Sequence, residues 1–341
     1  MLINKIYRSI LDRNAFWNYY NANLKAPNIE DIEDCYRFIT DFIKYSQKSQ
    51  TVLFKDIAFL KKNRPERLKH IVSAFFLGIW LFRHRTKFIY HSIIRELEIL
   101  NCFKNRNNDD IESQFTYVWF MATLFHDLGY KPEILQKREP IPSHVIPEYD
   151  KLGFPYRSVP DFYKNIYPKY YTYREEKEHG IFAGLTFDRD ITEIRRFQEN
   201  TSSELDWREE LEELYHYVAW IITSHNIWMI RGDSSDVEMY KKNNLNDLIL
   251  SSQKDKQGQY LEYKFRYDDY PLFSLFCIID TIEPLKLDFW PFKVDIRLEE
   301  GKMIIKSNNR EYLDRVSGLK DWLCPVIRED DCATIYLDNI L

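Results

Sequence analysis

The stretch FMATLFHDLGY, at residues 120–130, carries the strongest structural signal in the sequence. Apolar residues fill it up to one polar doublet, His126 and Asp127, and Gly129 follows as a residue typical of a helix C-terminus. The pattern predicts an apolar helix at about 112–128 that stops at this glycine. A buried imidazole or carboxylate without a partner is strongly unfavourable, so the doublet predicts a polar site inside a helical core.

Four other apolar helical segments each carry one group of the same kind. They contain His70 ahead of the apolar run at 71–82, His179 in EKEHGIFAGL, His225 at the end of VAWIITSHN, and Asp280 in LFSLFCIIDTIEP. A single histidine on an apolar helix is most often a hydrogen-bonded core residue. Five helices with one such group each are better explained by convergence on a metal ion, because helical bundles build metal sites from inward-facing side chains.

The order H…HD…H…H…D formed by these residues resembles the HD superfamily of metal-dependent phosphohydrolases, in its two-metal branch. The segments RLKHIVSAF, LFHDLGY, EHGIFAG and ITSHN resemble the family's ligand-bearing helices, and the resemblance covers about 64–290. It implies that one ion is held by His70, His126, Asp127 and Asp280, and a second by His179 and His225 with Asp127 as the bridge. Nitrogen and oxygen donors without a thiolate suit manganese, iron, cobalt, nickel or zinc.

The reaction that the resemblance implies is hydrolysis of a phosphate ester, with a nucleotide as the expected substrate. Two divalent ions would present a bridging hydroxide at neutral pH and would offset charge on a phosphoryl oxygen. Catalytic roles are expected for Asp127 and His126. A third is expected for Lys131, which lies one position after the place where many relatives have a lysine; Tyr130 occupies that place here.

An insert at 130–178 is rich in proline and tyrosine, and it predicts an irregular segment that shapes the pocket. A structural wrap over the core is the alternative. Because arginine offers two parallel donors to a phosphate, substrate contacts are expected here, from Tyr130, Arg138, His144 and Arg157. Placement on the solvent-exposed surface is the alternative for Arg138, His144 and Arg157. Glu178 and Glu283 are candidates for orienting the ligand histidines, with exposed helix charges as the alternative.

Two other functions stay open. The same ligand set resembles the di-iron oxygenase branch of the superfamily, and a non-catalytic sensor or scaffold could keep the same metal core. The chain has 48 Lys and Arg against 53 Asp and Glu, so its net charge is 48 − 53 = −5. This acidic balance does not favour a nucleic-acid partner, and the expected partner is a small phosphate ester or nucleotide.

The predicted architecture is mainly α, in three parts. An N-terminal helical extension covers 1–60, and an HD-type helical bundle with the metal site covers 61–290. A small α/β appendage covers 291–341, with a hairpin at 294–298 and 302–306, a helix at about 309–323 and a strand at about 333–338.

Glycine is scarce, with nine residues in a chain of 341. Neither G-x-G-x-x-G nor G-x-x-x-x-G-K-[ST] occurs, which makes a dinucleotide-binding Rossmann domain or a P-loop ATPase an unlikely class. Three of the nine, Gly129, Gly180 and Gly184, lie beside proposed ligands. Close approach of helices at these positions would need a missing side chain.

Compartment is indicated by the cysteines and by the apolar runs. Five cysteines form no C-x-x-C pair, which is typical of reduced thiols. Charges break the N-terminal segment too early for a signal peptide, and the apolar run of 12 residues at 71–82 is too short to span a bilayer. We therefore expect a soluble cytoplasmic protein without a membrane partner.

Overall fold

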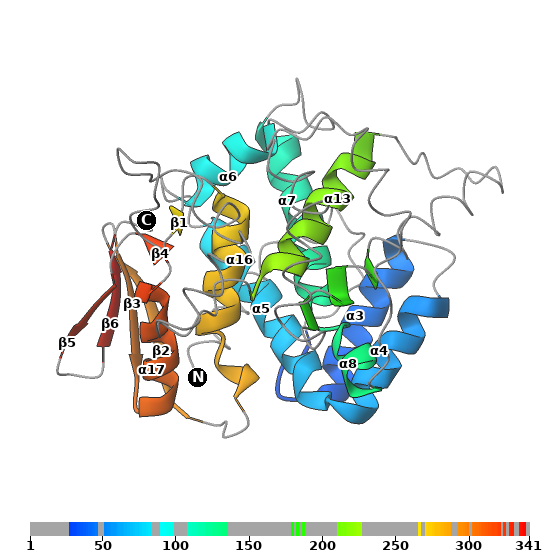
Figure 1. Ribbon diagram of the computed structural model, residues 1–341, viewed down its shortest axis with the longest axis horizontal. Coiled ribbons are helices and arrows are strands. Elements are labelled where there is room, and N and C mark those ends of the chain that lie inside the picture. The colour runs from blue at the N-terminus through cyan, green and yellow to red at the C-terminus, as the bar shows by residue number, and fades with distance from the viewer. Residues whose placement is uncertain are drawn as a thin grey trace, which may run out of the picture.

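The computed structural model describes fifteen stretches of the chain, at 27–46, 51–83, 89–98, 108–135, 179–180, 182–184, 186–187, 210–226, 265–266, 270–287, 292–299, 302–321, 323–324, 327–330 and 334–338. Helices dominate these residues, and a small sheet lies near the C-terminal end (Figure 1). The predicted mainly helical class is confirmed. Within the described ranges, none of the helices combines the length and the apolar character that a membrane crossing requires.

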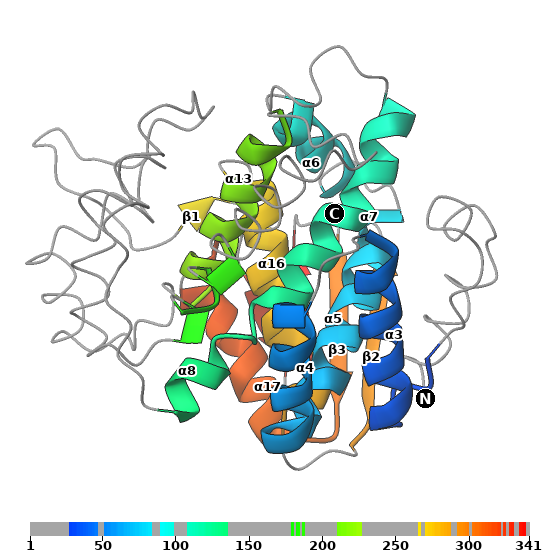
Figure 2. The ribbon, with the colours of Figure 1, turned by 90° about the vertical axis from the view of Figure 1, so that its right-hand side faces the viewer.

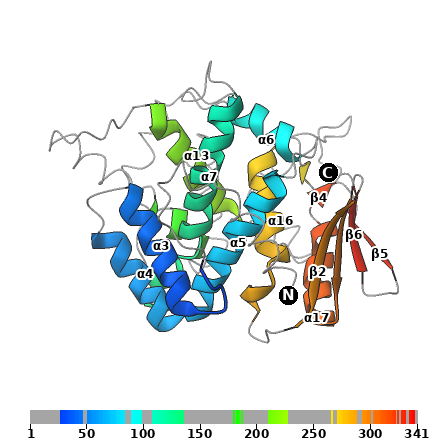
Figure 3. The same ribbon diagram turned by 180° about the vertical axis from the view of Figure 1, so that it is seen from behind.

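Helix α5 (Pro65–Arg83) is the central helix. Proline stands at its first position and Glu66 in its first turn, both of which favour a helix start. From Leu68 onward nearly every residue is buried, as in a helix that is apolar on all faces. It packs against α3 (Ile32–Ser46), α4 (Thr51–Asn63), α6 (Ile89–Glu98), α7 (Asn108–Phe125) and α16 (Pro271–Ile282). Figure 3 shows α5 between α16 and the α3–α4 pair.

The contact between α5 and α7 is fixed by Trp119. Its indole Nε1 lies 3.3 Å from the carbonyl oxygen of Ala74 and 3.0 Å from that of Phe75, and donates to both. A Cβ added to Gly78 would lie 2.1 Å from the indole ring, so the ring occupies the notch that this glycine leaves. The two helices therefore have one permitted register.

Helices α13 (Glu210–Ser224) and α16 complete the body, and Figure 2 shows them side by side. Every residue of α16 is buried. Trp220 of α13 packs on Phe273 of α16, with ring centroids 5.1 Å apart. Helix α13 ends at Ser224, one residue before His225.

The predicted α/β elements near the C-terminus are present. Strands β2 (Val294–Glu299), β3 (Lys302–Ser307), β6 (Thr334–Asp338) and β5 (Ile327–Asp330) form an antiparallel sheet in the order β2-β3-β6-β5. Helix α17 (Arg310–Ser317) packs on β3, β6 and α16. The hairpin and the strand at 333–338 are confirmed, and β5 was not predicted.

Two predicted helix ends are wrong. The helix predicted at 309–323 ends at Ser317 and is followed by the 3-10 turn η5 (Gly318–Asp321), after which Leu323 and Cys324 form the short strand β4 paired with β1 (Phe265–Arg266). The helix predicted at 112–128 ends at Phe125, and turns lead from there into the short helix α8 (Tyr130–Ile134). The rest of the insert, at 136–178, lies outside the described residues.

Candidate metal centre

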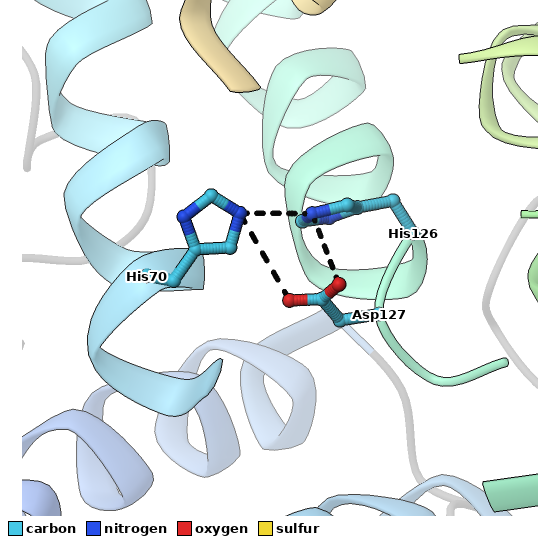
Figure 4. Close-up of side chains that lie close together, drawn as sticks. All are labelled: His70, His126 and Asp127. Carbon is cyan, nitrogen blue, oxygen red and sulfur yellow. Dashed lines mark hydrogen bonds and ion pairs between the residues drawn. The ribbon is translucent and has the colours of Figure 1, made fainter. Parts of the chain in front are cut away.

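Three of the predicted ligands form a compact group. His70 comes from α5, and His126 and Asp127 come from the turn after α7; Figure 4 shows the three side chains pointing toward one another. One ligand atom from each of the three lies within 4.8 Å of the other two, and all three residues are buried. Residues 56 positions apart in the sequence thus meet because α5 and α7 are locked in register.

The imidazoles of His70 and His126 face each other through their Nε2 atoms, 3.1 Å apart. Nδ1 of His126 lies 2.6 Å from the carbonyl oxygen of Thr123, which can only accept, so Nδ1 carries the proton. Nδ1 of His70 lies 2.7 Å from a carboxylate oxygen of Glu283. With both Nδ1 atoms engaged as donors, two Nε2 lone pairs would oppose each other unless a cation or a proton stands between them.

Protonation of His70 is favoured by the same surroundings. Burial acts to lower the pKa of His70, but its hydrogen bonds to Asp280 and Glu283 and the nearby charge of Asp127 raise that pKa above its ordinary value. The position between the two imidazoles therefore attracts positive charge.

Asp127 is fully buried, and neither of its carboxylate oxygens has a hydrogen-bond partner among the described residues. Its Oδ1 lies 3.3 Å from Nε2 of His126 and 4.0 Å from Nη1 of Arg67. Burial alone would raise the pKa of Asp127, but His126 and Arg67 hold it well below its usual range. A buried ionised carboxylate with unused oxygens is a fitting ligand for a metal ion.

Asp280 brings a fourth donor to this group from the last turn of α16. Its Oδ1 lies 3.0 Å from Nε2 of His70 and 3.5 Å from Nε2 of His126. Lys286 donates to both carboxylate oxygens, at 2.7 and 2.5 Å. Burial would raise the pKa of Asp280, but the ammonium group of Lys286 and the imidazoles lower it well below the ordinary value.

His179 and His225 form a second group next to the first. The ring centroid of His225 lies 5.3 Å from that of His126 and 5.2 Å from that of His179. Nδ1 of His225 donates to the carbonyl oxygen of Ile222 at 2.6 Å, and its buried Nε2 has no hydrogen-bond partner among the described residues. Burial lowers the pKa of His225 to about 4, so this imidazole is neutral at pH 7, as a metal ligand must be.

His179 is held by two neighbours of its own. The amide of Asn226 lies 3.3 Å from its Nε2, and the ring of Tyr130 stacks on it at 4.2 Å with an interplanar angle of 12°. Burial and the nearby His225 lower the pKa of His179 well below its ordinary value. All six predicted ligands are thus brought together, four around Nε2 of His70 and two beside them.

Three glycines permit this convergence, as their positions predicted. A Cβ added to Gly129 would lie 1.8 Å from the carbonyl oxygen of His179. One added to Gly180 would lie 2.9 Å from the ring of His225, and one added to Gly184 would lie 1.8 Å from the hydroxyl of Thr223. The helical residues at 179–180, 182–184 and 186–187 therefore sit directly against the ends of α7 and α13.

Glu283 takes the orienting position that the sequence suggested for it. Its carboxylate accepts from His70, from the hydroxyl of Ser73 at 2.5 Å, and from the backbone nitrogens of Leu285 and Lys286 at 2.9 and 3.0 Å. The last two bonds cap the short helix η4 (Pro284–Lys286). Four donors fix the carboxylate and thereby the tautomer of His70. Glu178 lies outside the described residues.

The remaining predicted site residues are placed less centrally. The ammonium group of Lys131 bonds Asp56 of α4 and does not reach the ligand group. Tyr130 is buried, and its ring contacts both His179 and the guanidinium of Arg67, which lies 4.5 Å from the ring centroid. Arg138, His144 and Arg157 lie outside the described residues.

Two cationic residues that face the carboxylates of Asp127 and Asp280 were not predicted from the sequence. Arg67 lies three positions before His70, and this helical spacing could have indicated a shared face. Lys286 follows Asp280 by six positions across the end of a helix, a spacing that carries no such signal.

No family model matches the sequence, and no curated protein and no solved structure matches it. What is established is a buried group of His70, His126 and Asp127 that could hold a metal ion.

Proposed function

We propose that the protein is a divalent-metal-dependent phosphohydrolase that hydrolyses a phosphate ester, with a nucleotide as the expected substrate. The observation that carries the proposal is the opposed Nε2 pair of His70 and His126 beside the unpartnered carboxylate of Asp127. A single divalent cation would satisfy all three groups at once. Imidazole and carboxylate donors without thiolate suit manganese, iron, cobalt, nickel or zinc.

His70, His126, Asp127 and Asp280 would hold one ion, and His179 and His225 a second with Asp127 shared between them. When bound, such ions supply hydroxide at neutral pH and offset charge on the phosphoryl group. The protein's own contribution is to fix the tautomer of His126 and His225 and to aim their Nε2 atoms inward through the Nδ1 bonds.

Arg67 is proposed to bind the phosphoryl oxygens of the substrate. Its Nε and Nη1 atoms are buried without a hydrogen-bond partner among the described residues, and its side chain keeps 14% of its surface exposed. A guanidinium offers parallel donors that match two phosphoryl oxygens. The ring of Tyr130 supports the guanidinium from one face.

The test combines metal analysis with phosphate release from a panel of nucleotides and simple phosphate esters. Wild-type protein is expected to hold a divalent ion and to release phosphate, and Asp127→Ala is expected to abolish both. Asp56→Ala is the matched control, since Asp56 is a buried carboxylate that pairs with Lys131 outside the centre.

Absence of ion from the wild-type protein, or undiminished turnover in Asp127→Ala, would contradict the proposal. Oxygen consumption that requires iron, without phosphate release, would favour an oxygenase instead.

A further inference from the structure

Lys286 forms a buried ion pair inside the centre. It lies in η4, directly after α16, and its ammonium group contacts both carboxylate oxygens of Asp280 at 2.7 and 2.5 Å. The side chains of Lys286 and Asp280 keep only 14% and 3% of their surfaces exposed. A pair so far removed from water is held strongly, because neither charge can be solvated separately.

The carboxylate of Asp280 contacts both Lys286 and His70. The Oδ1 atom that accepts from Lys286 also lies 3.0 Å from Nε2 of His70, within the group that needs a cation. A carboxylate that is already neutralised by an ammonium group has little charge left to offer a metal ion. An ion that uses Asp280 as a ligand must therefore weaken or replace its contact with Lys286.

With the imidazoles neutral, the charges of the centre are balanced without any ion. Three carboxylates, Asp127, Asp280 and Glu283, face three cations, Arg67, Lys286 and Arg315, so that 3 − 3 = 0. A divalent ion added to a neutral buried cluster leaves two uncompensated charges, which is strongly unfavourable. One of the three cations has to give way.

Lys286 is the cation best suited to move. Arg315 donates to the backbone carbonyl oxygens of Asp280 and Glu283 at 2.7 and 3.2 Å, so it is tied to the end of α16. Arg67 lies 4.0 Å from Asp127 and is stacked on Tyr130. The ammonium group of Lys286 stands at the end of a flexible four-carbon stem and pairs with Asp280.

We propose that Lys286 is an internal counter-ion that competes with the divalent ion for Asp280, so that ion binding displaces its ammonium group from the carboxylate. The proposal rests on the metal-binding part of the proposed function. Lys286 stabilises the ion-free protein and lowers its affinity for the ion. It acts on the ion through Asp280 and is thus a positioning residue.

The experiment measures Mn²⁺ affinity by calorimetric titration of the full chain, together with the melting temperature in the presence and absence of Mn²⁺. Lys286→Met removes the charge and keeps the apolar stem, and it is expected to bind Mn²⁺ at least about tenfold more tightly. Its ion-free form should melt lower and gain more on addition of Mn²⁺ than wild type. Lys61→Met is the matched control, because Lys61 forms an ion pair of 2.6 Å with Glu33 outside the centre.

A second variant tests the same competition in the opposite direction and keeps the buried charge. Lys286→Arg presents a two-pronged donor to Asp280, so it is expected to hold the carboxylate more firmly and to weaken Mn²⁺ binding. If Lys286 were purely structural, its replacement would lower the melting temperatures of the ion-free and Mn²⁺-bound protein equally. The affinity for Mn²⁺ would then be unchanged.

The possible failures are distinguishable. If wild-type protein binds no divalent ion, the proposed function fails. If wild type binds Mn²⁺ but Lys286→Met binds it with equal or lower affinity, or Lys286→Arg binds it more tightly, the competition proposed for Lys286 is overturned and the metal centre stands.

Discussion

The C-terminal ends of α7 and α13 share a histidine that bonds the helix backbone, and they differ in the residue that follows it. Each helix ends one residue before a histidine, and that histidine donates from Nδ1 at 2.6 Å to the carbonyl oxygen three positions earlier. The last carbonyl groups of a helix lack hydrogen-bond donors within the helix, and the imidazole Nδ1 supplies one. The opposite ring nitrogen, Nε2, then points into the core. The residue after the histidine is Asp127 at α7 and Asn226 at α13.

At both helix ends the same hydrogen bond to the backbone orients the imidazole, and the residue that follows the histidine sets the charge around it. At α7 the carboxylate of Asp127 completes a group with His70 and His126. At α13 the amide of Asn226 contributes no charge and instead lies 3.3 Å from Nε2 of His179. We therefore expect the α7 end to bind an ion first and the α13 end to depend on it.

The largest expected effect separates the two histidines. His126→Gln removes the imidazole opposite His70 and is expected to reduce Mn²⁺ affinity by more than about a hundredfold, since the ion loses one of its proposed imidazole ligands. His225→Gln is expected to keep the first ion and to lose turnover. Calorimetric titration and phosphate release check both, and equal loss of ion binding in the two variants would contradict the asymmetry.

The next effect concerns how closely the chain is packed at each end. Gly129→Ala places a Cβ 1.8 Å from the backbone oxygen of His179 and should destabilise the protein by about 3 kcal/mol. Gly184→Ala, at the α13 end, places a Cβ 1.8 Å from the hydroxyl of Thr223 and 2.9 Å from the backbone oxygen of Ala219. It should cost less than Gly129→Ala, since its closest contact is a side chain that can rotate.

Chemical denaturation of the ion-free proteins measures these differences. Gly318→Ala is the control, because Gly318 has a helical φ of −58° and no described atom lies within 4 Å of the added Cβ. It should be neutral or stabilising by up to about 1 kcal/mol. A Gly129→Ala protein as stable as Gly318→Ala would show that the tight contact is not required.

A smaller effect is expected when the two ends are made alike. Asn226→Asp places a carboxylate beside Nε2 of His179, where two acceptors then require a proton or a cation between them. We expect binding of a second Mn²⁺ to tighten by about tenfold, measured by titration after the first site is filled. Unchanged stoichiometry and affinity would mean that charge at this position does not limit the second ion.

The smallest effect is the pH dependence of stability. The pKa of His225 in the folded protein is about 4, below its unfolded value of about 6.5, so the unfolded chain binds more protons between these values. The stability associated with the neutral imidazole is present above pH 6.5 and is lost as the pH falls toward 4. His70 acts in the opposite sense, because its pKa is raised.

Denaturation midpoints of ion-free wild type and His225→Gln at pH 7 and pH 5 isolate this contribution. The midpoint of the variant should fall less over this range than that of wild type. Identical falls would show that His225 takes up its proton equally in both states.

Sequence patterning was sufficient where a residue's role depends on its own helix. The apolar helices, the order of the six candidate ligands and the three close-packed glycines could all be predicted, because burial and helical period appear directly in the sequence. The predicted helix end was less accurate at His126, since the imidazole that ends the helix also looks like part of its apolar face.

Residues whose role depends on another element could not be predicted. Lys286 reaches Asp280 only because η4 turns back after α16, and Lys131 is drawn to Asp56 by the packing of α4 on α8. Neither partner can be identified from spacing along the chain. The orienting contact of Glu283 with His70 was foreseen as one of two alternatives, and only the folded chain decides between them.

The contacts of His70 also bear on how the protein folds. His70 meets Glu283 and Asp280 across 213 and 210 positions of the chain, so these contacts close some of the longest loops in the described structure. Loops of this length close late, because their entropy is lost before the contacts are gained. An ion held by both ends of such a loop would bind after the folding transition state and act mainly on the rate of unfolding. The metal would then slow the unfolding of the protein without speeding its folding.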